Sequence, residues 1–389
     1  MSRPFSCRCR DGRLRWGRFA RAAGLLGLVA VVTGAGQADD GDAALVAIGA
    51  PGATRVAILD CASGRPRATI TLPAALAAEA ALAPDGSALF ASTRGRELLR
   101  YSVPGLREQA RAPLEFEPTA LAAAGGPDAV VLAGGRGAGA LSAHDPATLA
   151  ELQRYRLAEP FSVSAILDAP ARRRFVIAFA DLAEAWEIAY DPGAPPVLQG
   201  LVHDYRMGEA VPLPGRLTPR RFELPGPTQS LSAGAAPYEV ARIDRSGALG
   251  IVHLDVRREI ERPRTAAAPS PGRVSAWGSG ARRGWLIAAP GAAAAEVLEV
   301  ADWRVTGRIA VDGEILALAA ARGRVLVAHA RPDGVAVSLL DVARRAAEPI
   351  VTRLSSPALP LRLAAGTGGC YALFDRDDRW LAGFVVPPR

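Results

Sequence analysis

Residues 297–311 read Val297-Leu-Glu-Val-Ala-Asp302, a short turn, and Val305-Thr-Gly-Arg-Ile-Ala-Val311. The first run is a short apolar segment that ends in an acidic residue, and the second is another apolar-rich segment of strand length. Short apolar runs separated by polar turn residues are typical of consecutive antiparallel β-strands. The same order of strand, turn and strand recurs along most of the chain, so this pattern determines the predicted fold.

Copies of the first run recur at a nearly constant spacing. They end at Asp60, Ser102, Asp145, Asp191, Asp255, Asp302 and Asp341, and a weaker eighth copy spans Leu381–Val386. The successive steps are 42, 43, 46, 64, 47 and 39 residues, so a period near 43 residues fits every step except the one after Asp191. A repeat of this length that holds four short strands is typical of a propeller blade.

The repeat predicts an all-β fold, an eight-bladed β-propeller of four-stranded antiparallel blades, with seven blades as the fallback. Residues 44–49 are expected to complete the ring against the last blade, because a closed ring leaves only short, protected edges. We therefore predict a single propeller domain over residues 39–389. The one long step, after Asp191, predicts an insertion at about 195–224.

Residues 1–38 are predicted to be a cleavable export signal. They hold seven Arg and one Asp, followed by an apolar run from Ala22 to Thr33 and small residues at Gly36 and Ala38. The apolar run is shorter than the roughly 20 residues that span a bilayer, so we expect no membrane contact beyond the signal. Since the whole chain has a net charge of +7, the remainder is nearly neutral, which argues against a nucleic-acid partner. The protein is expected to be periplasmic.

The basic and cysteine residues exclude several chemistries. All 46 basic residues are Arg, which removes a Schiff-base lysine and the lysine of a phosphate-binding loop. The sequence has no C-x-x-C-H motif, so covalent c-type haem is excluded.

Cys61 and Cys370 lie in the first and last repeats, where a closed ring would make them neighbours. They form either a disulfide or two buried, inert thiols, and the sequence leaves both alternatives open.

The insertion holds the least repeat-like residues of the chain. Its segment 200–211 places an imidazole, a thioether, a phenol, a guanidinium and two carboxylates close together. These side chains belong to His203, Asp204, Tyr205, Arg206, Met207 and Glu209. Loops on a rigid scaffold often carry binding and catalytic residues, so this loop is the predicted functional site.

Together with the repeat and the export signal, this stretch resembles the d1-haem propeller of cytochrome cd1 nitrite reductase and its periplasmic relatives. That family, the cytochrome D1 domain within the YVTN-like β-propellers, includes accessory proteins of d1-haem biosynthesis. The specific likeness is confined to residues 185–224, whereas the blade pattern, which many propellers share, covers most of residues 43–386. The resemblance implies a d-type haem over the central channel, a histidine axial ligand, arginines near the tetrapyrrole carboxylates, and nitrite reduction or haem maturation.

Within this resemblance, His203 is the predicted ligand of the haem iron and Met207 a soft second ligand. The alternative is that His203 packs as an ordinary loop residue against Asp204 or Tyr205. Arg206 and Arg220 are suited to hold tetrapyrrole carboxylates by bidentate hydrogen bonds, or else they are solvated surface arginines. Trp186 either stacks on the macrocycle or packs within a blade.

Departures from the family limit the predicted function. After the export signal only His144, His203, His253 and His329 remain, and no c-type electron-donor domain is present, so a self-sufficient nitrite reductase is not predicted. The sequence favours a tetrapyrrole-binding or accessory protein of d1-haem and denitrification metabolism, with a tetrapyrrole or a periplasmic protein as partner. The alternative is a degenerate, cofactor-free propeller that acts as a protein-interaction or scaffold module. A non-enzymatic role is favoured; any activity would be an oxidoreductase or haem-maturation step at a bound d-type haem.

Overall fold

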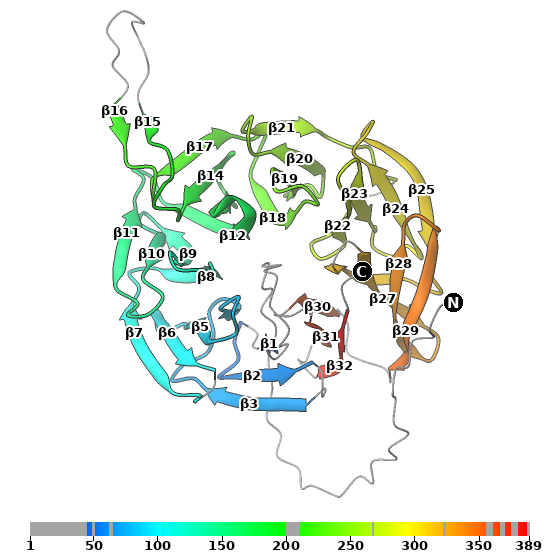
Figure 1. Cartoon of the computed structure of the whole chain (residues 1–389), viewed down its shortest axis with the longest axis horizontal. Coiled ribbons are helices and arrows are strands. Elements are labelled where there is room, and N and C mark those ends of the chain that lie inside the picture. The colour runs from blue at the N-terminus through cyan, green and yellow to red at the C-terminus, as the bar shows by residue number, and fades with distance from the viewer. Residues whose placement is uncertain are drawn as a thin grey trace, which may run out of the picture.

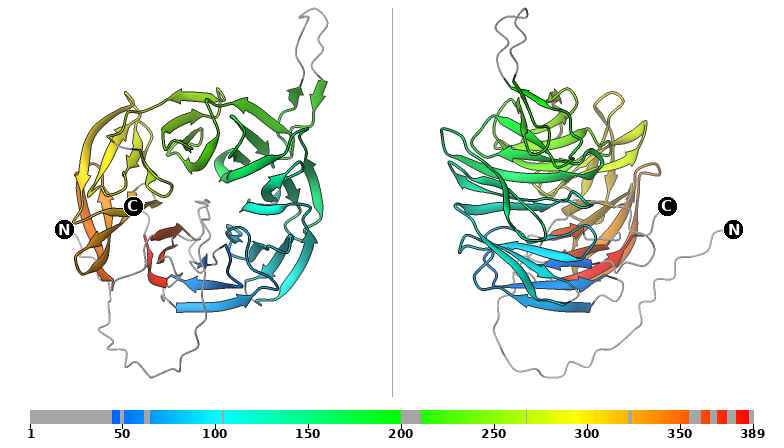
Figure 2. Two further views of the ribbon diagram at one scale, coloured as in Figure 1. Left: turned by 180° about the vertical axis from the view of Figure 1, so that it is seen from behind. Right: turned by 60° about the vertical axis from the view of Figure 1, so that its left-hand side comes forward.

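The computed structural model describes residues 45–48, 51–61, 65–103, 105–199, 211–266, 268–321, 324–354, 361–365, 370–374 and 380–386. In this part of the chain the regular structure is antiparallel β-sheet, apart from one 3-10 turn, η1 (Pro170–Arg172). The sheets follow one another in chain order around a ring (Figures 1 and 2). The predicted all-β, propeller-like architecture is therefore confirmed. No helix in the described ranges is long and apolar enough to cross a membrane.

Four sheets each consist of four consecutive strands that pair in chain order. The first contains β4 (Ala81–Leu82), β5 (Ala88–Ser92), β6 (Glu97–Ser102) and β7 (Glu108–Pro113). The second contains β18 (Thr228–Ala233), β19 (Glu239–Asp244), β20 (Leu249–His253) and β21 (Arg258–Glu261). The third contains β22 (Val274–Ser279), β23 (Arg282–Ile287), β24 (Ala294–Glu299) and β25 (Arg304–Ala310). The fourth contains β26 (Ile315–Ala321), β27 (Arg324–Arg331), β28 (Gly334–Asp341) and β29 (Ala346–Leu354).

A fifth, eight-stranded sheet is made of two such units. One contains β8 (Glu117–Ala123), β9 (Val131–Gly137), β10 (Leu141–His144) and β11 (Glu151–Tyr155), and the other β12 (Phe161–Ala169), β13 (Arg174–Phe179), β14 (Glu184–Ala189) and β17 (Pro219–Glu223). The units are joined by two residue pairs between β12 and β9. The short hairpin of β15 (Val197–Gln199) and β16 (Val211–Leu213) forms a separate two-stranded sheet. Strand β17, which falls in the predicted insertion, thus completes a sheet of the ring.

The first and last sheets each have three described strands. They are β1 (Leu45–Ile48), β2 (Arg55–Asp60) and β3 (Arg65–Thr71), and β30 (Arg362–Ala365), β31 (Cys370–Phe374) and β32 (Trp380–Val385). Five sheets in the described ranges have four or more strands, so the prediction of eight four-stranded blades, and the fallback of seven, is wrong. Two units merge through the pairing of β12 with β9, and the end sheets are shorter. Strand β1 pairs with β2 within the first sheet, and Val46 packs against Phe374 of the last sheet, so β1 meets the last sheet through side chains and not through strand pairing.

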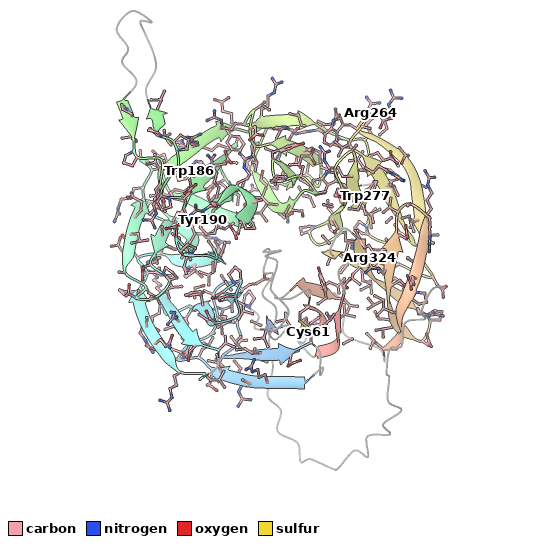
Figure 3. All side chains as sticks on the ribbon, in the orientation of Figure 1. Cys61, Trp186, Tyr190, Arg264, Trp277 and Arg324 are labelled. Carbon is pink, nitrogen blue, oxygen red and sulfur yellow. A yellow bond between two sulfur atoms is a disulfide. The ribbon has the colours of Figure 1, made fainter. Side chains whose placement is uncertain are left out.

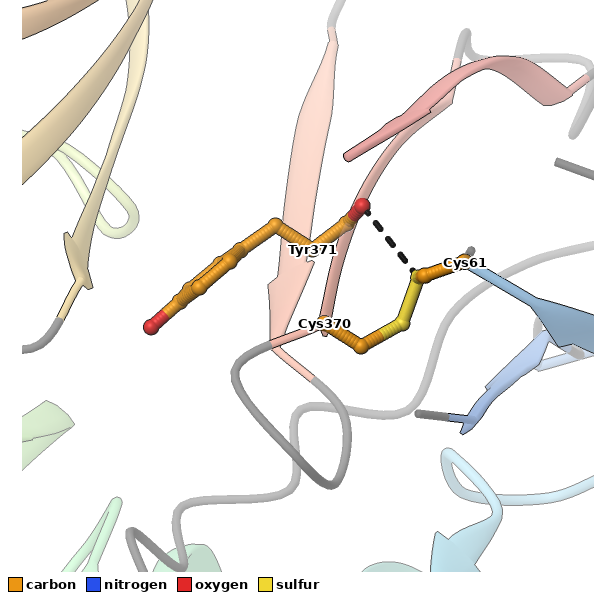
Figure 4. The surroundings of a disulfide bond; sticks show 3 residues. All are labelled: Cys61, Cys370 and Tyr371. Atoms are coloured by element: carbon orange, nitrogen blue, oxygen red, sulfur yellow. Dashed lines mark hydrogen bonds between the residues drawn. A yellow bond between two sulfur atoms is a disulfide. The ribbon is translucent and has the colours of Figure 1, made fainter. Parts of the chain in front are cut away.

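A disulfide joins the first sheet to the last. Cys61 and Cys370 are bonded, with their Cα atoms 5.6 Å apart. Figure 4 shows the bond beside Tyr371, whose backbone carbonyl oxygen lies 3.6 Å from Cys61 Sγ. Around the disulfide, Val46 from β1 packs in one buried cluster with Phe374 from β31. Of the two alternatives left by the sequence, the structure has the disulfide, and the described ends of the ring are held by this bond and by side-chain packing.

The sheet of β18–β21 buries a complete ion pair. Arg242 in β19 is 0% exposed, and its Nε donates to Glu259 Oε2 at 2.6 Å. Its Nη1 also reaches the hydroxyl of Thr228 on the inner strand at 3.3 Å. Gly250, which lies between the two charged residues in the sheet, makes room for them, because a Cβ there would lie 2.2 Å from Glu259 Oε2. A buried charge requires such a partner, since an isolated ion in the interior is costly.

Candidate functional site

Most of the predicted site falls on residues whose position is not described. His203, Asp204, Tyr205, Arg206, Met207 and Glu209 all lie outside the described ranges. The strands that flank them, β15 and β16, stand at the outer edge of the ring in both opposed views (Figures 1 and 2). The described base of the insertion therefore projects from the periphery, whereas the resemblance implied a site over the axis.

Trp186, the predicted stacking residue, is buried in the wall of the ring (Figure 3). Its ring lies 4.9 Å from that of Phe179 and 5.9 Å from that of Phe161, measured between centroids. Its indole N–H donates to Glu184 Oε2 at 3.2 Å, and Arg221 covers the ring from 5.3 Å. These contacts occupy the indole, so Trp186 packs between strands, as its alternative interpretation held, and is not accessible to a macrocycle.

Arg220, the other described candidate, lies on β17 directly opposite Glu187 of β14. Its Nη2 donates to the backbone carbonyl of Pro195 at 2.9 Å, which ties β17 to the base of the hairpin. Burial lowers the pKa of Arg220, and the nearby charges of Arg174 and Arg257 lower it further. The structure thus brings Arg220 together with two other arginines, which the sequence had not linked to it.

Three consecutive arginines, Arg172 to Arg174, form the turn between β12 and β13 and hold three units together. Arg172 pairs with Glu187 at 3.2 Å and with Asp255, beyond β20 of the next sheet, at 2.7 Å. Arg173 reaches in the other direction, pairing with Asp191 at 2.9 Å and with Asp128 of the β8–β9 turn. Arg174 also pairs with Glu187, which is 1% exposed, at 3.3 Å. The arginines of this turn therefore join three neighbouring units by ion pairs.

Two described histidines are buried in matching arrangements. The Nδ1 of His144 lies 3.0 Å from the carbonyl oxygen of Leu149, and its Nε2 lies 2.8 Å from the Ser142 hydroxyl. His329 has the same pattern, with a carbonyl at Nδ1 and the Ser338 hydroxyl at Nε2, 3.1 Å away. Burial lowers the pKa of both imidazoles. Because a carbonyl can only accept, Nδ1 carries the proton, and the single lone pair, on Nε2, accepts the serine hydroxyl.

The third described histidine, His253 at the end of β20, stacks on Tyr238 with 4.6 Å between ring centroids. Its Nδ1 accepts a hydrogen bond from the backbone N–H of Asp255 at 3.3 Å. Arg283 of the next sheet donates to the Tyr238 hydroxyl and pairs with the buried Glu239 at 2.6 Å. His253 therefore belongs to a packed polar contact between neighbouring sheets.

A buried carboxyl at the end of β12 is the most strongly perturbed acid described. The Tyr190 hydroxyl donates to Asp168 Oδ1 at 3.1 Å, whereas Oδ2 is buried without a described partner. Burial raises the pKa of Asp168 to about 7. Perturbed acids often mark functional sites, but this one faces Tyr190 and no described cavity, so we assign it to stability.

Asp168 predicts a pH dependence of stability. Its folded-state pKa, about 7, exceeds the ordinary aspartate pKa of 3.8, so the unfolded chain releases this proton first as the pH rises. Protonated Asp168 contributes fully to the free energy of unfolding below about pH 4. As the pH rises from about 4 to 7 the free energy of unfolding falls by on the order of 4 kcal/mol. Asp168→Asn should therefore gain stability relative to the wild type over this interval in urea unfolding. The same gain in the exposed Asp302→Asn control would contradict the assignment.

The other described features do not form a ligand-binding or metal-binding site. A hollow of about 340 Å³ on the sheet of β26–β29 is lined by Arg324, Leu339, Asp341, Ala343, Arg344 and Glu348. Its two arginines and two carboxylates balance, so it selects neither sign of charge. Within the described ranges no group of three His, Cys, Asp or Glu side chains is arranged to hold a metal ion.

Comparisons with known proteins bear on the fold. No protein-family model matches the chain, and no curated protein matches it in sequence. Dihydro-haem d1 dehydrogenase NirN, solved in complex with DHE, is 17% identical, with a TM-score of 0.61 over 94% of this chain and 74% of that one. BamB from Moraxella catarrhalis is 12% identical, with a TM-score of 0.59 over 93% of this chain and 95% of that one. At such identities the likeness shows the fold alone, which is that of a β-propeller.

Proposed function

We propose that this chain is an exported, cofactor-free β-propeller that acts as a scaffold for another periplasmic protein. The observation that carries the proposal is the state of the histidines. The lone pairs of His144, His253 and His329, all those in the described ranges, accept hydrogen bonds from the protein itself. A neutral imidazole has one lone pair, so binding a haem iron would require each to give up its partner.

The described residues do not fit a d-type haem. None of them offers a free imidazole, and the indole of Trp186 is enclosed by aromatic rings and Arg221. The strands that flank His203 lie at the outer edge of the ring (Figure 1). These features favour the scaffold over the tetrapyrrole-binding protein that the sequence resemblance implied.

The export of the protein is part of the proposal. Disulfides persist in oxidising compartments such as the periplasm and are rare in the cytosol. The Cys61–Cys370 bond therefore supports the interpretation of residues 1–38 as an export signal. We expect the exported protein to begin at Asp39, which mass spectrometry of the intact periplasmic protein measures directly.

A tetrapyrrole-binding role is the second candidate. It is favoured by the fold, which the chain shares with a protein solved as a dihydro-haem d1 dehydrogenase. In this role His203 would be the iron ligand, Met207 a second ligand, and Arg206 and Arg220 the partners of the tetrapyrrole carboxylates. Any oxidoreductase or haem-maturation activity would belong to this candidate.

A titration separates the two candidates. Purified protein that lacks residues 1–38 is mixed with d1-type haem and with ordinary haem, and the visible spectra are compared with those of His203→Ala. The scaffold predicts the spectrum of free haem for both proteins, because a cofactor-free propeller binds no haem iron and the three described histidines have their lone pairs engaged. A Soret shift at stoichiometric haem that disappears in His203→Ala would contradict the scaffold and establish the second candidate. His253→Ala is the matched control, since it removes an imidazole that is already engaged.

A further inference from the structure

Four arginines gather where the unit of β12–β17 meets the sheet of β18–β21. We call Arg172, Arg174, Arg220 and Arg257 the arginine cluster. Arg172 and Arg174 come from the β12–β13 turn and the start of β13, Arg220 from β17, and Arg257 from the turn between β20 and β21. Strands β17 and β21 follow each other along the outer rim of the ring (Figure 1). The cluster is thus built by segments from two neighbouring units.

The cluster surrounds one buried carboxylate. Glu187 lies opposite Arg220 in the sheet and forms ion pairs with Arg172 at 3.2 Å and Arg174 at 3.3 Å. Asp255 supplies a second carboxylate, which binds Arg172 at 2.7 Å. The cluster therefore holds four guanidinium groups and two carboxylates, and both of these carboxylates bind Arg172.

The other arginines keep unused donors. In the described ranges Arg174 has one ion pair, with Glu187, and Arg220 donates to two backbone carbonyls, the nearer at 2.9 Å. Arg257 has no hydrogen-bond or ion-pair partner for its guanidinium among the residues described; its position is fixed by a backbone hydrogen bond to the carbonyl of His253. Since each guanidinium carries five N–H donors, most of the donors in the cluster are free to bind an anion.

The location of the cluster strengthens such binding. The side chains of Arg172 and Arg174 are each 15% exposed, so their charges are only partly screened by solvent. The Asp255 side chain is 55% exposed, which shows that the cluster opens to solvent on this side. Burial is the main cause of the lowered pKa of Arg220, and the charges of Arg174 and Arg257 lower it further. A bound anion would relieve this repulsion between like charges.

We propose that the arginine cluster is a binding site for an oxyanion, either a phosphate or a carboxylate group of a small molecule. Arg174, Arg220 and Arg257 would hold it by charge-assisted hydrogen bonds, the planar fork of arginine being suited to both groups. Glu187 and Arg172 would position Arg174. The site does not depend on the scaffold role and lies apart from His203 in the sequence.

Calorimetric titration of the protein without residues 1–38 tests the site. The probes are inorganic phosphate and citrate, each compared with chloride at equal ionic strength. We expect saturable binding of at least one probe, and the tighter of the two identifies the group. In Arg174→Gln/Arg220→Gln the dissociation constant should rise by roughly tenfold or more, because two charge-assisted bonds are lost.

Two further variants keep the test decisive. Arg257→Gln removes an exposed side chain without a described partner, so it should weaken binding without affecting the fold. Arg264→Gln, an exposed arginine at the outer edge of the ring, is the matched control and should bind as the wild type does (Figure 3). The proposal is overturned if the wild type binds neither probe above the chloride background, or if Arg257→Gln binds as tightly as the control. Neither result decides the haem titration, because the spectral change there depends on His203.

Discussion

Replacing both Cys61 and Cys370 by alanine is expected to lower the free energy of unfolding by about 3–5 kcal/mol. The bond joins residues 309 apart in sequence and links the first sheet to the last, so its loss frees nearly the whole chain in the unfolded state. For a chain of this size, that loss corresponds to a decrease in melting temperature of roughly 4–7 °C. Calorimetry or circular dichroism of the two proteins measures it.

Reduction provides the control. Both sulfur atoms are buried, so alanine also removes some packing. The wild type unfolded in the presence of a reductant loses the cross-link but keeps the sulfur atoms. It should fall to within about 1 kcal/mol of the double-alanine variant, which the reductant should not affect. A wild type whose unfolding is insensitive to reductant would show that the bond does not hold the ring.

Replacing Glu259 by methionine should destabilise the protein by about 3–5 kcal/mol, because it leaves the guanidinium of Arg242 buried without its counter-ion. Arg242 is 0% exposed, and its other described partners are the neutral groups of Gly226 and Thr228. Urea unfolding followed by tryptophan fluorescence gives the change from the midpoint at constant slope.

The double variant Arg242→Met/Glu259→Met distinguishes the loss of a partner from the loss of packing. With both charges removed, no buried ion remains, and the stability should return to within about 1–2 kcal/mol of the wild type. Arg262, which also pairs with Glu259 at 3.0 Å, is exposed to solvent and needs no replacement. Additive effects of the two substitutions would contradict the assigned coupling.

The repeat predicted individual strands well because each strand depends on a local pattern. The seven clear copies and the weaker eighth each overlap a strand, namely β2, β6, β10, β14, β20, β24, β28 and β32, although several copies extend into the following turn. The number of four-stranded blades was not predictable in this way. It depends on pairing between strands far apart in sequence, such as Phe161 of β12 with Gly137 of β9, and on which strands complete the end sheets.

The candidate site was harder to predict than the fold. Glu187 reads as one polar residue within an apolar strand, and its arginine partners, Arg172 and Arg174, lie 15 and 13 residues away in the chain. The sequence near Arg172–Arg174 does not distinguish arginines that form ion pairs with other units from arginines that are exposed to solvent in a hairpin turn. The one available signal was the carboxylate itself, because a charged residue on a buried strand requires a partner.

The closure of the ring between its first and last sheets is tested most directly by a peptide map without reduction. Protein isolated from the periplasm is alkylated, digested and analysed by mass spectrometry. We predict one cross-linked species that joins the peptides of Cys61 and Cys370, which separates on reduction. Recovery of both peptides as alkylated free thiols would contradict the closed ring and remove the support for export.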